Sequence, residues 1–240
     1  MTAGSARRYV FWTMLIPLIS CTVPPSSNPT ALVDAYERGI RAAAVRAPSF
    51  AVDLRTIPPD QLDVIVATFT EWGIPVSPTQ RPVWVSIPDE LWALCRGKPN
   101  AVLAIQEALG LPPAQLPSQP NHQWQVITFH VPRSALFRPC PGGIEISMDR
   151  CENTVADGLD EKTARFLLEQ IWDSHRVSFR KPDGRPDWGH PFTGTGWTYN
   201  WDPLATSPVG VSEFVVRPGT SITGPATALP SQFCGQRRSR

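Results

Sequence analysis

The chain has 240 residues, of which 42% are hydrophobic, and its 22 basic and 21 acidic side chains leave a formal charge of +1 at pH 7. A chain of this length and hydrophobic content can form a core, which excludes a disordered protein. The balanced charge excludes strong electrostatic attraction to nucleic acid or to an anionic membrane surface. The 27 prolines predict many fixed turns, because each proline locks φ and removes a backbone donor.

The N-terminus combines two basic residues, an apolar run and a cysteine in a fixed order. Arg7 and Arg8 precede residues 9–19, an uncharged and mostly apolar run that is shorter than the about 20 residues needed to cross a bilayer. The run leads into the sequence LISC, which ends at Cys21 and resembles the lipobox of bacterial lipoproteins. The resemblance implies a signal peptide over residues 1–20, cleavage before Cys21, a diacylglyceryl group on its thiol and acylation, as with palmitate, of the new amino terminus.

Loss of this leader sets the charge and the expected location of the mature chain. Arg7 and Arg8 leave with it and residues 1–20 contain no acid, so 20 basic and 21 acidic residues remain, a net charge of −1. The lipoprotein resemblance implies an envelope location. Thr22 stands where an aspartate would retain the protein at the inner membrane, so the expected site in a Gram-negative organism is the outer membrane, facing the periplasm. The expected partners are the membrane, through the lipid on Cys21, and another envelope protein, with no nucleic acid.

Four further cysteines predict two disulfide bonds. They are Cys95, Cys140, Cys151 and Cys234. An even number in an exported chain favours disulfides, with three possible pairings. Cys140 and Cys151 flank a turn-rich loop, so their pairing costs the least chain entropy, and Cys95 would then pair with Cys234. A zinc site is the alternative, but the spacings contain no Cys-x-x-Cys pair.

Hydrophobic periodicity predicts an irregular alternation of helices and strands. The expected helices cover residues 31–45, 59–72, 89–95, 101–109 and 160–175. The expected strands cover residues 50–54, 81–87, 122–131, 197–201 and 211–217. The intervals are too short and too rich in proline for a doubly wound sheet. We therefore predict one disulfide-stapled α+β domain over residues 31–235, in which a mixed or antiparallel sheet packs with about four to five helices, between a flexible tether (21–30) and a basic tail (236–240).

The segment 173–202 has the densest set of histidines, carboxylates and aromatic side chains. The candidate binding residues are Arg180, Arg185, Trp188, Trp197 and Trp201. Aromatic and arginine anchors carry much of the energy of protein interfaces. The alternative is that the segment forms two tight turns and that its tryptophans belong to the core, since Trp197, Tyr199 and Trp201 would share one strand face.

Catalytic and metal-binding patterns in the chain are weak. Asp187 and His190, with His175, could ligate a divalent ion, but Asp-x-x-His is a common spacing, so no metal or cofactor is expected. Residues 208–222 resemble the strand of ADP-ribosyltransferases that carries their catalytic glutamate. The resemblance implies that role for Glu213, although Val211 stands where that family has a second glutamate.

Two hypotheses of function follow. The first is a non-enzymatic binding, accessory, immunity or exclusion lipoprotein of the envelope. The alternative is an envelope enzyme, ADP-ribosyltransferase-like or glycan-acting, that uses Glu213, His190 and the 173–202 segment. Convergence of Glu213, His190 and Asp187 around a cleft would favour the enzyme.

Overall fold

A seven-stranded antiparallel sheet organises the protein. The computed structural model describes residues 29–44, 52–113, 123–151, 159–174, 179–180, 186–187 and 189–235, and from 171 to 188 it describes no side chains. The strand order is β4-β8-β2-β1-β3-β9, and β7 also pairs with β8. These strands are β1 (Asp63–Thr70), β2 (Val83–Ser86), β3 (Gln125–Pro132), β4 (Leu136–Phe137), β7 (Trp197–Tyr199), β8 (Val209–Val216) and β9 (Thr223–Ala228). A separate two-stranded sheet joins β5 (Phe179–Arg180) to β6 (Pro186–Asp187).

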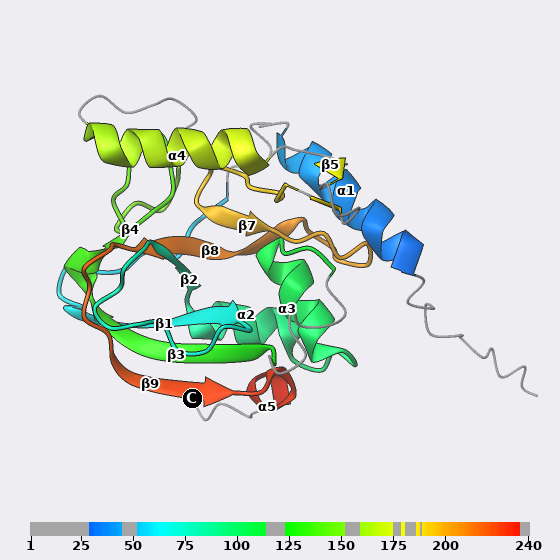
Figure 1. Ribbon diagram of the computed structural model, residues 1–240, viewed down its shortest axis with the longest axis horizontal. Coiled ribbons are helices and arrows are strands. Elements are labelled where there is room, and N and C mark those ends of the chain that lie inside the picture. The colour runs from blue at the N-terminus through cyan, green and yellow to red at the C-terminus, as the bar shows by residue number, and fades with distance from the viewer. Residues whose placement is uncertain are drawn as a thin grey trace, which may run out of the picture.

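Five α-helices within the described residues pack around this sheet (Figure 1). They are α1 (Pro29–Ala44), α2 (Pro88–Cys95), α3 (Ala101–Leu109), α4 (Glu161–Ser174) and α5 (Pro230–Gly235). A short 3₁₀ helix, η2 (Arg133–Ala135), links β3 to β4. Figure 1 shows α4 lying above β7 and β8, and α5 beside the end of β9. The predicted fold class, an α+β domain with an antiparallel sheet, is confirmed.

The predicted helix over residues 59–72 is wrong, because residues 63–70 form β1. Every residue of β1 is in register with a residue of β3, from Asp63 opposite Pro132 to Thr70 opposite Gln125. The segment is rich in β-branched residues, whose side chains fit a pleated sheet better than a helix. The same apolar residues can be aligned with a helical stripe, so the cross-strand pairing decides between the two structures. Gly73, expected to end the helix, instead adopts a φ of 79° just after the strand.

The other long helices form where the sequence predicts them. Asn100 caps α3, accepting a hydrogen bond from Leu103 N at 3.1 Å, and Gly110 ends the helix with a φ of 66°. Asp160 caps α4, accepting from Thr163 N at 2.9 Å. The predicted strand over 50–54 is wrong where the structure describes it, because residues 52–54 form no regular element.

Two apolar clusters account for most of the core. The first lies on one face of the sheet and includes Val66, Phe129 and Phe214, closed by Ile57 and Ile146 from two loops that hydrogen-bond to each other at 3.0 Å. The second lies beneath α2, α3 and α5. Its central side chains are Leu91, Ile105, Val126, Val211 and Phe233.

Both predicted disulfides are present. Cys95–Cys234 joins the end of α2 to α5 inside the second cluster, across 139 residues of sequence. Cys140–Cys151 closes a loop with a sequence separation of 11 residues. Among the helices of the described residues, none has the length and apolar character needed to span a bilayer.

Candidate functional site

A cavity of about 250 Å³ lies between the sheet, the end of α3, α4 and residues 190–199. The sheet contributes Ala67, Phe69, Trp84, Ser86 and Glu213 to its lining. The end of α3 contributes Leu109, Gly110 and Leu111. The remaining walls include Gln170, His190, Phe192 and Tyr199. We call this space the Glu213 cavity.

The register of three neighbouring strands explains why a cavity exists here. Ala67 on β1 pairs with Ser86 on β2, and Ser86 pairs with Glu213 on β8. Directly paired residues of antiparallel strands project from the same face. Two small side chains therefore stand in one row with Glu213, and the bulkier rings of Phe69 and Trp84, two positions along their strands, also line the cavity. The recess is a consequence of side-chain size along this row.

Aromatic contacts hold the walls in place. The rings of Trp84 and Phe192 meet edge to face, with centroids 5.7 Å apart. Phe166 of α4 lies 6.0 Å from both Trp84 and Phe137, measured between ring centroids. Such pairs add about 0.5–1.5 kcal/mol each beyond the area that they bury. The walls are thus tied to α4 as well as to the sheet.

Gly110 allows the end of α3 to approach residues 191–199 closely. A Cβ at this position would lie 3.0 Å from Pro191 Cγ and 3.2 Å from the carbonyl oxygen of Tyr199. Nearby, Thr198 Oγ1 donates to the carbonyl of Ala108 at 2.6 Å and accepts from Val211 N at 2.8 Å. These contacts fix α3, β7 and β8 relative to one another at one end of the cavity.

Glu213 is the acidic group of the cavity. Its Oε2 oxygen is inaccessible to solvent and has no hydrogen-bond partner among the described residues. Burial raises the pKa of this carboxyl to about 8, and the positive charge of Arg138 offsets only part of that effect. The carboxyl is therefore mostly protonated at neutral pH, when it can both donate and accept a hydrogen bond.

Arg138 supplies a buried positive charge behind Glu213, at 0% exposure. Its guanidinium donates to the carbonyls of Arg55 at 2.6 Å and Gly196 at 3.3 Å, and it lies 4.6 Å from the ring centroid of Phe214. Burial lowers its pKa to about 10, although the negative charges of Glu90 and Glu213 act in the opposite direction. Arg138 therefore keeps its charge at neutral pH.

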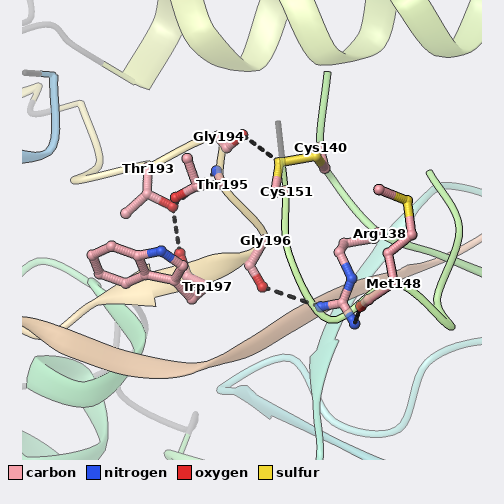
Figure 2. The surroundings of a disulfide bond; sticks show 9 residues. All are labelled: Arg138, Cys140, Met148, Cys151, Thr193, Gly194, Thr195, Gly196 and Trp197. Atoms are coloured by element: carbon pink, nitrogen blue, oxygen red, sulfur yellow. Dashed lines mark hydrogen bonds between the residues drawn. A yellow bond between two sulfur atoms is a disulfide. The ribbon is translucent and has the colours of Figure 1, made fainter. Parts of the chain in front are cut away.

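The Cys140–Cys151 disulfide lies beside the segment that supplies a carbonyl to Arg138 (Figure 2). Cys151 Sγ is 3.3 Å from the carbonyl oxygen of Gly194. This contact is not a hydrogen bond, because a disulfide sulfur carries no proton. Gly196 follows in the same segment with a φ of 79°, and a Cβ there would lie 2.8 Å from Arg138 Cδ. The disulfide and Arg138 thus hold opposite ends of one short stretch of chain (Figure 2).

Glu90 of α2 is a second carboxylate near this charge. It accepts hydrogen bonds from Ser212 N at 3.2 Å and from Ser212 Oγ at 3.1 Å. Burial raises its pKa, and its hydrogen bonds with Ser212 and the charges of Arg55 and Arg138 act in the opposite direction. Glu90 is thus hydrogen-bonded, whereas Oε2 of the neighbouring Glu213 is not.

His190 is an exposed residue of the lining that contacts α1. The hydroxyl of Tyr36 donates to the carbonyl of Gly189 at 2.8 Å, and His190 Nδ1 is 3.4 Å from the same hydroxyl oxygen. That oxygen can accept a proton from Nδ1, which favours the tautomer with the Nδ1 proton. Tyr36 also meets the ring of Trp201 edge to face, with centroids 5.6 Å apart. Contacts with α1 therefore position His190 near the cavity.

The structure brings together only part of the predicted site. Glu213 and His190 both line the cavity. The tryptophans Trp197 and Trp201 are 2% and 4% exposed and belong to the core, so they cannot act as exposed anchors. The side chains of the other predicted residues, Arg180, Arg185, Trp188 and Asp187, lie outside the described residues. Within the part of the chain whose side chains are described, no group of three or more His, Cys, Asp or Glu residues could hold a metal ion.

Sequence reasoning missed Trp84, Ser86, Glu90 and Arg138. A serine at the end of the short strand β2 carries no functional signal until its neighbours are known. Arg138 and Glu90 are separated from Glu213 in sequence by 75 and 123 positions, and only the fold gives them a common electrostatic environment. Glu213 was the one sequence feature that pointed to this part of the sheet, because it is an acidic residue within an apolar strand.

No family model, no curated protein and no solved structure matches this chain. Function therefore has to be inferred from the residues and geometry of the site.

Proposed function

We propose that this protein is a lipid-anchored envelope protein that binds a small molecule in the Glu213 cavity. The observation that carries the proposal is a cavity with aromatic walls in which Glu213 is the one carboxyl group among the described lining residues. Burial makes this carboxyl costly to ionise, and a ligand that hydrogen-bonds to it would offset part of that cost. Small-molecule sites commonly combine mostly apolar walls with a few polar groups of this kind.

The size of the cavity limits the ligand. Its volume of about 250 Å³ is slightly below the range of about 300–1,000 Å³ typical of drug-sized ligands. The proposed ligand is therefore a single small ring system with a short polar substituent, rather than a dinucleotide or an oligosaccharide.

Filling the cavity should abolish ligand binding. Ser86→Leu would place a larger side chain in the row beside Glu213, whereas Ser221→Leu changes an exposed loop residue. We expect ligand-observed NMR of a fragment library to detect fragments that bind the wild type and Ser221→Leu, and to lose at least about tenfold in affinity with Ser86→Leu. Thermal melting of each variant shows that it is folded. If no fragment binds, or if binding is equal in all three proteins, the cavity is not a ligand site.

The anchor is tested separately. Cys21→Ala removes the thiol that the lipobox resemblance assigns to the lipid, so the protein should be unlipidated and either uncleaved or released in soluble form. Mass spectrometry of the mature N-terminus should find a diacylglyceryl-modified Cys21 in the wild type. An unmodified Cys21 in envelope fractions would contradict lipid anchoring and leave the cavity proposal untouched.

Acid–base catalysis is the second candidate, favoured by the raised pKa of Glu213 and by the presence of His190 in the same lining. A carboxyl that titrates near neutral pH is suited to act as a general acid or base. An enzyme would convert its ligand, whereas a binding protein would release it unchanged. Recovery of unaltered fragments after prolonged incubation with the protein therefore favours binding over catalysis.

A further inference from the structure

We infer that the Glu213 cavity takes an organic cation, a small molecule with a protonated amine on a flat apolar ring. This inference rests on the proposed function and specifies the class of ligand. Three observations support it: the charge of the lining, the aromatic walls, and the position of Glu213 opposite Ser86 at the cavity.

The charge of the lining favours a cation over an anion. Glu213 is the one carboxylic acid among the described lining residues, and none of those residues is lysine or arginine. An anion placed here would lie beside Glu213 with no lysine or arginine of the described lining to pair with; His190 is the one other lining side chain that can carry a positive charge. A cation would pair with the carboxylate in a site of low dielectric constant, where opposite charges attract more strongly than in water.

The walls of the cavity also suit a cation with an apolar body. Phe69, Trp84, Phe192 and Tyr199 present aromatic side chains around the space. The negative face of an aromatic ring attracts an ammonium group that lies within about 6 Å of the ring centroid. The same rings bury the apolar part of the ligand, so one set of side chains serves both ends of the molecule.

Glu213 gives the amine a partner at the wall of the cavity. Glu213 and Ser86 both line this space, and they stand opposite each other in the sheet. An ammonium group has three protons to donate, so one can reach the carboxylate while others reach neutral oxygens such as the Ser86 hydroxyl. A protonated amine thus fits the two polar groups that this part of the sheet presents to the cavity.

Binding a cation changes the protonation of Glu213. Without a bound cation the Glu213 carboxyl holds a proton at neutral pH, and pairing with an ammonium requires the ionised form, so one proton passes to solvent on binding. The other charged or titratable groups around it are Arg138, Glu90, His190 and Tyr199. Arg138 keeps its charge, and burial raises the pKa values of Glu90 and Tyr199. Comparing the wild type with a variant of Glu213 therefore shows whether the released proton comes from this carboxyl.

Three probes with the same ring test the inference: benzylamine, benzyl alcohol and benzoate, which are cationic, neutral and anionic at neutral pH. Isothermal titration at about pH 7, in buffers of different ionisation enthalpy, measures both affinity and proton release. We expect benzylamine to bind the wild type at least about tenfold more tightly than benzyl alcohol, and benzoate to bind most weakly. Close to one proton should be released per benzylamine bound at about pH 6.5, and few at about pH 9.

A matched pair of variants assigns the effect. Glu213→Gln should remove both the preference for benzylamine and the proton release. Glu107→Gln replaces another carboxyl whose pKa burial raises, to about 7, but which does not line this cavity, so it should keep both. If benzyl alcohol or benzoate binds the wild type as tightly as benzylamine, or if benzylamine does not bind, the ligand is not a cation. Fragment binding that Ser86→Leu abolishes would still support the cavity as a ligand site in that case.

Discussion

Replacing Cys95 and Cys234 together by alanine is expected to lower the free energy of unfolding by about 5 kcal/mol. The bond closes a sequence separation of 139 residues, and the entropy that a cross-link removes from the unfolded chain grows with the logarithm of the loop length. It also joins α2 to α5 within a buried cluster, where loss of the sulfurs removes packing as well. Urea unfolding followed by circular dichroism measures the difference.

The second disulfide is the matched control for this prediction. Cys140 and Cys151 are separated by 11 residues, so their replacement by alanine should cost about 3 kcal/mol in the same treatment. The two double variants should therefore differ by about 2 kcal/mol, with the Cys95 and Cys234 variant less stable. Equal losses in the two variants, or a larger loss from the short loop, would show that strain or packing rather than chain entropy sets the stabilisation.

Glu213→Gln is expected to stabilise the protein increasingly as pH rises. The folded-state pKa of Glu213 is about 8 and its ordinary value is 4.5, so between these values the folded protein holds a proton that the unfolded chain has released. The stability of the wild type therefore falls as pH rises from about 4.5 to about 8, and a glutamine removes this loss. The free energy of unfolding of the variant should match that of the wild type near pH 4.5 and exceed it by up to about 5 kcal/mol near pH 9, as measured by urea unfolding at a series of pH values.

Other groups that titrate in the same pH range contribute equally to the stability of the wild type and of Glu213→Gln, so their contributions cancel in the difference. Burial also raises the pKa of Glu107, to about 7, and this group is present in both proteins. The informative quantity is the difference between variant and wild type at each pH. A difference that does not change with pH would mean that the Glu213 carboxyl has an ordinary pKa, and it would remove the electrostatic basis for the proposed site.

Local signals were sufficient to predict much of the fold. The ends of helix α3 could be predicted from the sequence, because Asn100 caps its first turn and Gly110 ends it, as the structure shows. The four cysteines likewise allowed one economical pairing, and that pairing is present. Helix α1 and strand β3 follow from periodicity alone.

Elements whose identity depends on distant partners could not be predicted in the same way. The apolar residues of β1 fit a helical stripe and a strand face equally well, and the pairing with β3, more than 50 residues later, selects the strand. Strand β9 has the sequence TGPATA, with no apolar alternation, and it exists because β3 offers it an edge.

The candidate site was predictable only in part for a related reason. Glu213 and His190 stood out as chemical groups in the sequence, and both line the cavity. The cavity itself depends on two small residues, Ala67 and Ser86, that are in register with Glu213 on the neighbouring strand, and register cannot be read from one strand at a time. The density of tryptophans near residue 200 reflected the core instead, since Trp197 and Trp201 are buried.

The most direct test of a ligand site at Glu213 is NMR of its side-chain carboxyl carbon during titration with a fragment that binds the wild type. Because Glu213 lines the cavity and Glu90 and Glu107 do not, we expect a saturating shift of the Glu213 resonance that is larger than the shifts of the other two. The midpoint of that shift should give the same dissociation constant as calorimetry. Saturation of the protein with ligand while the Glu213 resonance stays unmoved would show that the ligand does not bind in the Glu213 cavity.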